Sequence, residues 1–406
     1  LLHQQDTHAG FPYHYLDPHT ANVFDWIFDV VPREDFYART GIQFMNFNTI
    51  FQLATLKRNQ VPVLDIADTM LLMPNALTYL LCGDVSAEYT HATTTHAYNP
   101  TTQDWAWELI DKLGLPKRLF PEIKPPCTVV GQLQDAICDE LNCQPVPVIL
   151  AGSHDTASAV AAIPAEPDTN WAFLSSGTWS LFGVELDEPC LSSDAMEANF
   201  TNEGAVGGRI RFLRNIMGQW MVQQSRQTWR QQGHDYSFPE LVKLSSEAPA
   251  FQSFIDPNDD SFVAPGDMPA RIQAFCKRTG QPVPETVGEI VRCADESLAL
   301  RYRQCLEQLE DVTGKALDVL HLVGGGSKNE MLNQYTANAI GRNIIAGPAE
   351  ATAAGNVLAQ AMATGEIASL DEGRAFIANS FETATYTPQD RKAWEEAYKH
   401  YRKIVG

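Results

Sequence analysis

The tripeptide His154-Asp155-Thr156 carries the clearest chemistry in this sequence. It follows a short apolar run, residues 146–150, which predicts a buried strand, and it precedes small residues typical of a tightly packed helix. Polar residues between a strand and a helix lie where open α/β sheets bind their ligands. The helix dipole keeps such a carboxylate ionised, so Asp155 can accept a proton from a substrate hydroxyl. An aspartate there can also cap the helix, and the two roles are compatible.

Two glycine-containing turns have a composition that suits phosphate binding. Residues 171–184 predict two strands joined by a turn at 175–178 (SSGT), where small hydroxyl-bearing residues would let a phosphate approach the backbone. An ordinary glycine turn is the simpler interpretation of that segment. Residues 324–329 (GGGSKN) lie between a strand predicted at 317–323 and a helix predicted from about Glu330. This second turn has neither a Walker A nor a G-x-G-x-x-G pattern, so its spacing alone is a weak indication of a nucleotide.

Periodicity predicts the larger elements that position these turns. Apolar residues at steps of three and four predict a long amphipathic helix over 284–309, and residues 213–229 and 390–405 also predict amphipathic helices. The polar, β-branched run YTHATTTH at 89–96 favours a solvated loop or an edge strand over a pocket wall.

The turn-rich segment 164–170 (PAEPDTN) is the strongest candidate for a domain boundary. A chain of 406 residues has room for two sizeable cores. We therefore predict a first domain over 1–168, a second over 169–388, and a C-terminal helix within 389–406 that docks across the domains.

Composition restricts the classes of partner. The chain has 29 basic and 50 acidic residues and a net charge of −21, which argues against nucleic acid and anionic membranes but not against ATP. No apolar run is long enough to span a bilayer. The eight cysteines show no zinc-binding spacing, so we expect no metal site, reduced thiols and a cytoplasmic protein. Cys276 and Cys293 flank a proline-rich loop and could approach each other as free thiols.

Several segments, taken together and in order, resemble the FGGY family of carbohydrate kinases over essentially the whole chain. Each alone is moderate evidence. They are GIQFMNFNT (41–49), HATTTH (91–96), GSHDTASAV (152–160), LSSGTWSL (174–181), NFTNEG (199–204), RNIMGQW (214–220), PNDDSF (257–262), LVGGGSKNEMLNQ (322–334) and AGPAEATAAGN (346–356).

The resemblance implies an α/β fold of two ribonuclease-H-like domains of the actin and Hsp70 type, facing a cleft that binds a sugar and ATP. By position it implies that Asp155 is the catalytic base, with His154, Thr156 and Asn215 at the sugar. It also implies a set of residues that contact ATP: Thr178, Gln223, Gly325, Gly326 and Asn329.

A histidine directly before the aspartate resembles the L-rhamnulose branch of the family rather than its glycerol or xylulose branches. The resemblance therefore implies phosphorylation of the 1-hydroxyl of L-rhamnulose with ATP and Mg²⁺, by a monomer or a homodimer. A kinase for L-fuculose or a pentulose is an alternative. A second alternative is a non-catalytic remnant that binds sugar or nucleotide, because the family's opening hairpin with its Asp-x-Gly phosphate loop does not precede Leu1 here. The first domain is thus expected to be incomplete at its N-terminus.

Overall fold

The computed structural model describes residues 1–3, 7–8, 13–14, 17–166 and 169–406. Its contacts form two compact units, each discontinuous in sequence. Unit 1 comprises Leu1–Ala162, Glu185–Leu213 and Thr352–Ile377, and unit 2 comprises Ile163–Val184, Arg214–Ala351 and Ala378–Gly406. The domains predicted at 1–168 and 169–388 stay a prediction, because the chain passes between the units more than once.

Unit 1 is mainly helical, with short strands between the helices. Its helices are η1 (Pro18–Thr20), α1 (Phe24–Val30), α2 (Arg33–Thr40), α3 (Thr49–Arg58), α4 (Val63–Ile66), α5 (Met73–Cys82), α6 (Tyr89–Ala92), η2 (Thr93–Thr95), α7 (Trp107–Lys112), η3 (Lys117–Leu119), α8 (Asp135–Leu141), α9 (Asp155–Ala161), α10 (Ser193–Glu197), α16 (Ala351–Ala363) and most of α17 (Leu370–Ser380). Its strands are β1 (Leu2–His3), β2 (Thr7–His8), β3 (Ala87–Glu88), β4 (Tyr98–Asn99), β5 (Asp104–Trp105), β6 (Ile123–Lys124), β7 (Thr128–Gln132), β8 (Pro147–Leu150), β11 (Thr201–Gly204) and the first half of β12 (Ile210–Met217).

An aromatic core fixes the first helices of unit 1. The rings of Phe36 and Phe51 pack edge to face at 5.6 Å, and both side chains are fully buried. The His96 ring lies 5.1 Å from Phe51, so the core reaches the polar run 89–96. Edge-to-face pairs of this kind add to the stabilisation that burial alone provides.

The polar run 89–96 forms α6 and η2, so the prediction of a solvated loop or an edge strand was wrong. The carboxylate of Glu88 caps α6 by accepting from the backbone N–H groups of Thr90 and His91. The hydroxyls of Thr93 and Thr95 donate to carbonyls three residues earlier. These local bonds satisfy the polar side chains inside the unit, which is why a β-branched polar run can be buried here.

The strand predicted at 146–150 forms as β8, but only its last residue, Leu150, is buried. β8 pairs antiparallel with β7 in a two-stranded sheet, so the prediction of a buried strand was wrong. The helix predicted after it forms as α9 and begins at Asp155. Its small residues allow a close approach of α16, since a Cβ on Gly355 would lie 1.8 Å from the carbonyl oxygen of Ser158.

Unit 2 combines a mixed sheet with long helices. Its strands are β9 (Trp171–Ser176), β10 (Trp179–Leu186, as far as Val184), the second half of β12, β13 (Val319–Val323), β14 (Asn343–Ala346) and β15 (Ala384–Tyr386). Its helices are α11 (Trp220–Gln231), α12 (Phe238–Glu247), η4 (Asp260–Phe262), α13 (Met268–Arg278), α14 (Val287–Thr313), η5 (Gly325–Lys328), α15 (Glu330–Ile340) and α18 (Arg391–Val405).

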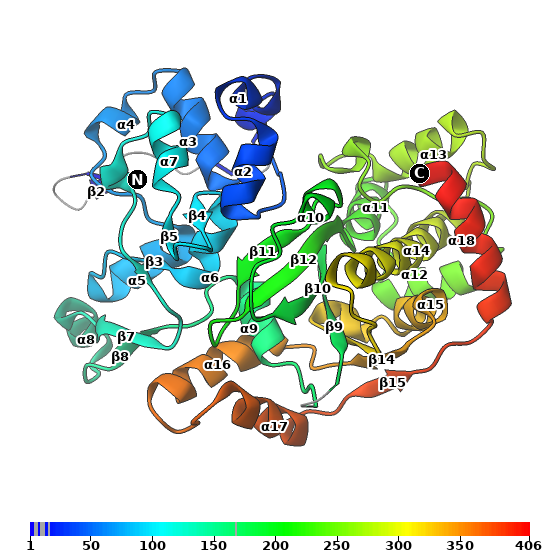
Figure 1. The fold of residues 1–406 in the computed structure, drawn as a ribbon. Helices are drawn as coiled ribbons and strands as arrows, with labels where there is room; N and C mark the ends of the chain where they lie inside the picture. Colours follow the sequence, from blue (N-terminus) through cyan, green and yellow to red (C-terminus); the bar gives the residue numbers. More distant parts are fainter. Residues whose placement is uncertain (4–6, 9–12, 15–16, 167–168) are drawn as a thin grey trace. The chain divides into compact units, whose positions relative to one another are not determined.

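The unit 2 sheet has parallel strands at its centre. β13 pairs parallel with β9 and with β14, β9 pairs antiparallel with β10, and β14 pairs antiparallel with β15. The predicted strand pair joined at 175–178, and the predicted strand–turn–helix unit around 324–329, are both confirmed. The predicted long helix forms as α14, which begins with a capping box of Thr286 and Glu289 and packs against α12 and α15 (Figure 1).

The helix predicted over 213–229 was wrong in its first part. β12 continues to Met217, and the helix α11 begins only at Trp220. The chain turns at Gly218, where a Cβ would lie 2.5 Å from the Ser180 hydroxyl and 2.9 Å from the Ser180 backbone nitrogen. The apolar residues before this turn are therefore buried by strand pairing, and periodicity alone did not separate them from the helix.

The C-terminal helix forms as α18 and packs against α14 and α15. The Tyr398 hydroxyl donates to Glu307 of α14 at 2.5 Å. Because these contacts lie within unit 2, docking across the domains stays a prediction. In the described part of the chain, no helix is long and apolar enough to cross a membrane. All eight cysteines are free, and the buried Cys276 and Cys293 hydrogen bond to each other.

Candidate functional site

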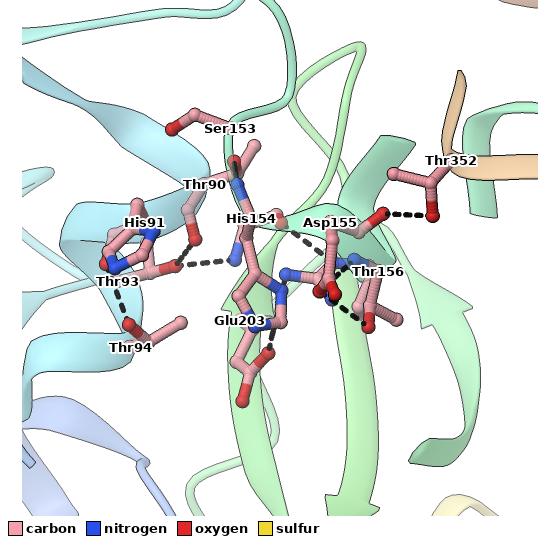
Figure 2. Close-up of polar contacts among 12 residues, drawn as sticks. Thr90, His91, Thr93, Thr94, Ser153, His154, Asp155, Thr156, Glu203 and Thr352 are labelled. Atoms are coloured by element: carbon pink, nitrogen blue, oxygen red, sulfur yellow. Dashed lines mark hydrogen bonds and ion pairs between the residues drawn. The ribbon is translucent and has the colours of Figure 1, made fainter. Parts of the chain in front are cut away.

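Asp155 is the first residue of α9, and its side chain is exposed. The preceding residue, His154, is the N-cap and makes no side-chain capping bond. Oδ1 of Asp155 accepts a hydrogen bond from the backbone N–H of Thr156 at 2.7 Å (Figure 2). Asp155 thus lies one residue inside the helix rather than at the N-cap. Its exposed carboxylate can be reached by a substrate group.

The turn before Asp155 is bound by α6 and the residue that caps it. Glu88 accepts hydrogen bonds from the backbone nitrogen of Ser153 at 3.1 Å and from its hydroxyl at 2.6 Å. The Thr90 hydroxyl accepts from the backbone nitrogen of His154 at 3.2 Å (Figure 2). Glu88 is fully buried. Burial raises the pKa of its carboxyl, while the bonds from Ser153 and Thr90 act in the opposite direction.

His154 lies among buried polar side chains. Its ring is 6.0 Å from the ring of His91, and its Nδ1 is 3.8 Å from Oε2 of Glu203 (Figure 2). Burial holds the pKa of His154 well below its usual value, and the positive charge of Arg211 acts in the same direction. The imidazole is therefore neutral at physiological pH. A neutral imidazole can both donate and accept a hydrogen bond, which suits contact with a sugar hydroxyl.

Arg211 is the buried cation of this region. Its side chain is fully inaccessible, its Nε donates to the carbonyl of Gly204 at 2.8 Å, and its Nη2 lies 3.3 Å from Oε2 of Glu203. Burial lowers the pKa of Arg211, and the charges of Glu203 and Asp155 raise it. A buried guanidinium among these acids adds a fixed positive charge close to the Asp155 carboxylate.

Thr156 is buried directly after Asp155, and its hydroxyl lies 3.3 Å from Oδ1 of Asp155. On α16, the Thr352 hydroxyl donates to the carbonyl oxygen of Asp155 at 3.4 Å (Figure 2). Three predicted residues of the sugar site, 154 to 156, therefore stand together. The fourth, Asn215, is half-buried on the part of β12 that belongs to unit 2.

Two of the predicted nucleotide residues meet in unit 2. The Thr178 hydroxyl, in the turn between β9 and β10, donates to Oε1 of Gln223 on α11 at 3.2 Å. The carbonyl of Thr178 accepts from the backbone nitrogens of Gly218 and Trp220, each at 3.2 Å. The turn is thus tied to the start of α11, which gives the Thr178 hydroxyl a fixed position.

The remaining predicted nucleotide residues lie after β13. Gly326 is buried against β9, where a Cβ would lie 2.0 Å from the Ser176 hydroxyl. Gly325 beside it faces open space, since a Cβ there would meet nothing within 4 Å. Asn329 caps α15 through Oδ1, which accepts from the nitrogen of Leu332 at 3.1 Å.

Sequence reasoning missed the buried polar residues that support His154 and Asp155. Glu88 and Glu203 are charged residues within otherwise uncharged segments, and Arg211 lies in a predominantly apolar strand, so isolated charges were the available signal. In the described ranges, no group of three His, Cys, Asp or Glu side chains could hold a metal ion.

Comparisons with known proteins agree with this architecture. The family models described as "FGGY family of carbohydrate kinases" match residues 13–162 with the N-terminal domain and 172–364 with the C-terminal domain. A protein named rhamnulokinase from Bacteroides thetaiotaomicron is 47% identical over 394 residues, covering 97% of this chain and 80% of the relative. A protein of the same name from Halalkalibacterium halodurans is 41% identical, covering 97% of this chain and 82% of the relative.

Among solved structures, a gluconate kinase from Lactobacillus acidophilus superposes with a TM-score of 0.80 at 19% identity, covering 99% of this chain and 80% of that chain. At that identity the likeness concerns the fold. It confirms the predicted class, an α/β architecture with two domains of the ribonuclease-H-like, actin and Hsp70 type.

Proposed function

Since the chain belongs to the FGGY family of carbohydrate kinases, we propose that it transfers the γ-phosphoryl group of ATP to the 1-hydroxyl of L-rhamnulose. The products would be L-rhamnulose 1-phosphate and ADP. The observation that carries the proposal is the exposed Asp155 directly after His154, in a chain 39 to 47% identical to proteins named rhamnulokinase. A role in the catabolism of L-rhamnose follows from that substrate.

Asp155 would be the general base. Its carboxylate would take the proton of the 1-hydroxyl while the hydroxyl oxygen bonds to the γ-phosphorus and the bond to the ADP oxygen breaks. The exposure of Asp155 supports this role, because a substrate hydroxyl can reach the carboxylate. His154, Thr156 and Asn215 would contact the sugar and orient the hydroxyl, and such positioning supplies much of the rate in phosphoryl transfer.

ATP would bind through Thr178, Gln223, Gly325, Gly326 and Asn329. The hydroxyl of Thr178, held by the turn and by Gln223, would donate to a phosphate oxygen. The open face at Gly325 leaves room for the nucleoside. Mg²⁺ would arrive with the phosphates, whose oxygens and waters supply most of its ligands, and it would neutralise part of their charge. A monomer or homodimer and a cytoplasmic location stay predictions.

The test is Asp155→Asn in the full chain, with Asp135→Asn as the matched control. Asp135 is also an exposed first residue of a seven-residue helix of unit 1, α8. Loss of a general base predicts that kcat for sugar-dependent ADP release falls about 10²- to 10⁴-fold in Asp155→Asn and stays unchanged in Asp135→Asn. Near-normal turnover of Asp155→Asn would contradict the proposed role of Asp155 as the general base.

The substrate is tested by comparing kcat/KM for L-rhamnulose, L-fuculose and pentuloses with the unmodified chain. L-Rhamnulose should have the highest value, and a higher value for another ketose would move the proposal to that sugar. Thermal stabilisation by ADP without turnover on any ketose would instead support a non-catalytic binding protein.

A further inference from the structure

We propose that Glu88 is a positioning residue, which fixes the turn Ser153-His154 and thereby orients the carboxylate of Asp155 toward the sugar hydroxyl. The proposal rests on the proposed role of Asp155 as the general base. Glu88 lies 67 positions earlier in the sequence, on β3, and would not itself touch the substrate.

The turn that carries Asp155 needs support from outside its own helix. The N-cap residue His154 makes no side-chain capping bond, and α9 has only seven residues. Within the segment, the Ser158 hydroxyl donates to the carbonyl of Gly152 at 2.6 Å, and the carbonyl of His154 accepts from the backbone nitrogens of Ala157 at 2.8 Å and Ser158 at 3.3 Å. The backbone N–H groups of Ser153 and His154 take no part in these bonds, and their acceptors lie outside α9.

Glu88 supplies those partners with one carboxylate oxygen. Its Oε2 accepts from the Ser153 nitrogen at 3.1 Å, the Ser153 hydroxyl at 2.6 Å and the Thr90 hydroxyl at 2.6 Å. The Thr90 hydroxyl in turn accepts from the His154 nitrogen at 3.2 Å. Two consecutive backbone N–H groups, immediately before Asp155, are thus held by Glu88 directly and through Thr90.

A carboxylate is specifically suited to this position. The side chain also accepts from the Thr90 nitrogen at 2.9 Å and the His91 nitrogen at 3.2 Å. It is therefore the acceptor in each side-chain hydrogen bond described for it. A glutamine amide would present an N–H₂ group to at least one of these donors. Capping a four-residue helix such as α6 needs only a short polar side chain, so the cap alone does not account for a fully buried glutamate that also reaches Ser153.

Glu88→Gln tests the proposal, and Glu296→Gln is the matched control. Glu296 is also a buried carboxylate that accepts from a backbone nitrogen, that of Phe251 at 2.8 Å, but it lies in unit 2 on α14. For Glu88→Gln we expect kcat per folded molecule to fall about 10- to 100-fold with the KM for ATP unchanged, because small displacements of a catalytic group are costly. Glu296→Gln should lose stability and keep its kcat.

Amide hydrogen exchange of the ligand-free chain gives a second readout that does not need turnover. In Glu88→Gln the amides of Ser153 and His154 should exchange at least about tenfold faster, because their acceptor contacts are weakened. Glu296→Gln should leave both rates unchanged. Unchanged exchange and unchanged kcat in a folded Glu88→Gln would overturn the proposal.

Two further variants keep the test decisive if Glu88→Gln does not fold. Ser153→Ala removes the hydroxyl donor only, and Glu88→Asp keeps the charge but shortens the reach. Both should lower kcat less than Glu88→Gln does, and a double-mutant cycle of Glu88→Asp with Ser153→Ala should be non-additive. Additive effects would contradict the proposed link. Full activity of Asp155→Asn would refute the proposed function instead. Faster exchange at Ser153 in Glu88→Gln would still show that Glu88 fixes the turn, because that readout does not depend on turnover.

Discussion

Glu203 and Arg211 lie directly opposite each other on β11 and β12, and 3.3 Å separates Oε2 of Glu203 from Nη2 of Arg211. Both side chains are buried, with 6% of Glu203 and 0% of Arg211 exposed. Oε2 of Glu203 also lies 3.8 Å from Nδ1 of His154. Removing one member of a buried ion pair leaves the other charge buried without its partner, so loss of either member alone should destabilise the fold even if the pair adds little net stability.

Arg211→Met should therefore lower the free energy of unfolding by about 3–5 kcal/mol. The double variant Arg211→Met with Glu203→Gln should recover part of that loss, because the remaining buried charge is removed. Urea denaturation of the wild type, both single variants and the double variant measures these values. A loss below about 1 kcal/mol in Arg211→Met would mean that water or another cation reaches Glu203.

His96 should make the protein sensitive to acid. Its ring is fully buried, and burial lowers its pKa to about 3. The unfolded chain binds a proton on this residue below about pH 6.5, and the folded chain does so only near pH 3, so stability is fully present above pH 6.5. As the pH falls between these values, protonation of His96 in the unfolded chain should lower the free energy of unfolding by up to about 1.4 kcal/mol per pH unit. His91, with a pKa of about 4, acts in the same direction.

His96→Asn should make the pH dependence of unfolding shallower by this amount. The backbone of residue 96 is left-handed, with φ 62°, which asparagine tolerates. The Thr40 hydroxyl donates to the carbonyl of Phe36, so the asparagine amide N–H₂ can donate to the Thr40 oxygen as the imidazole does. The variant loses ring packing at every pH, so the slope rather than the absolute stability is the readout. His234→Asn, at an exposed histidine, is the control and should keep the slope of the wild type.

Gly325→Ala should weaken nucleotide binding without destabilising the fold. A Cβ at this position meets no protein atom within 4 Å, so the free energy of unfolding should change by less than about 0.5 kcal/mol. If a nucleotide lies against Gly325, the added methyl group should weaken ADP binding about tenfold, or about 1.4 kcal/mol. Calorimetric titration with ADP measures this. Gly326→Ala should behave differently and lose stability, because its Cβ would meet Ser176.

Gly355→Ala should separate α16 from α9. The new Cβ would lie 1.8 Å from the carbonyl oxygen of Ser158 and 2.5 Å from its carbonyl carbon, and neither backbone atom can move by itself. Overpacking of this kind costs about 1–3 kcal/mol or more. Thermal unfolding should show a lower midpoint, with Gly325→Ala as the control for an alanine in open space. An unchanged midpoint of thermal unfolding would contradict this prediction and show that α9 and α16 can move apart without loss of stability.

Several elements could be predicted from the sequence because their signals are local. The periodicity of α14, the glycine turn between β13 and α15, and the helix that begins at Asp155 depend on residues within a few positions of one another. The residues 154 to 156 could be identified as a candidate site for the same reason, since their place between a strand and a helix is visible in the sequence. Their assigned roles came from resemblance and stay predictions.

The tertiary structure decided what those local signals could not. Glu88 and Ser153 are 65 positions apart, and only folding brings a buried carboxylate to the turn before Asp155. The threonine-rich run 89–96 became buried helix because Glu88 and neighbouring carbonyls satisfy its polar groups. The sequence by itself therefore determined the presence of these local elements, whereas the start of α11 at Trp220 depended on the strand pairing of β12. The partners of the buried charges depend on contacts between segments that are distant in the sequence. Local sequence patterns cannot predict these contacts, because they carry no information about the free energy of long-range pairing.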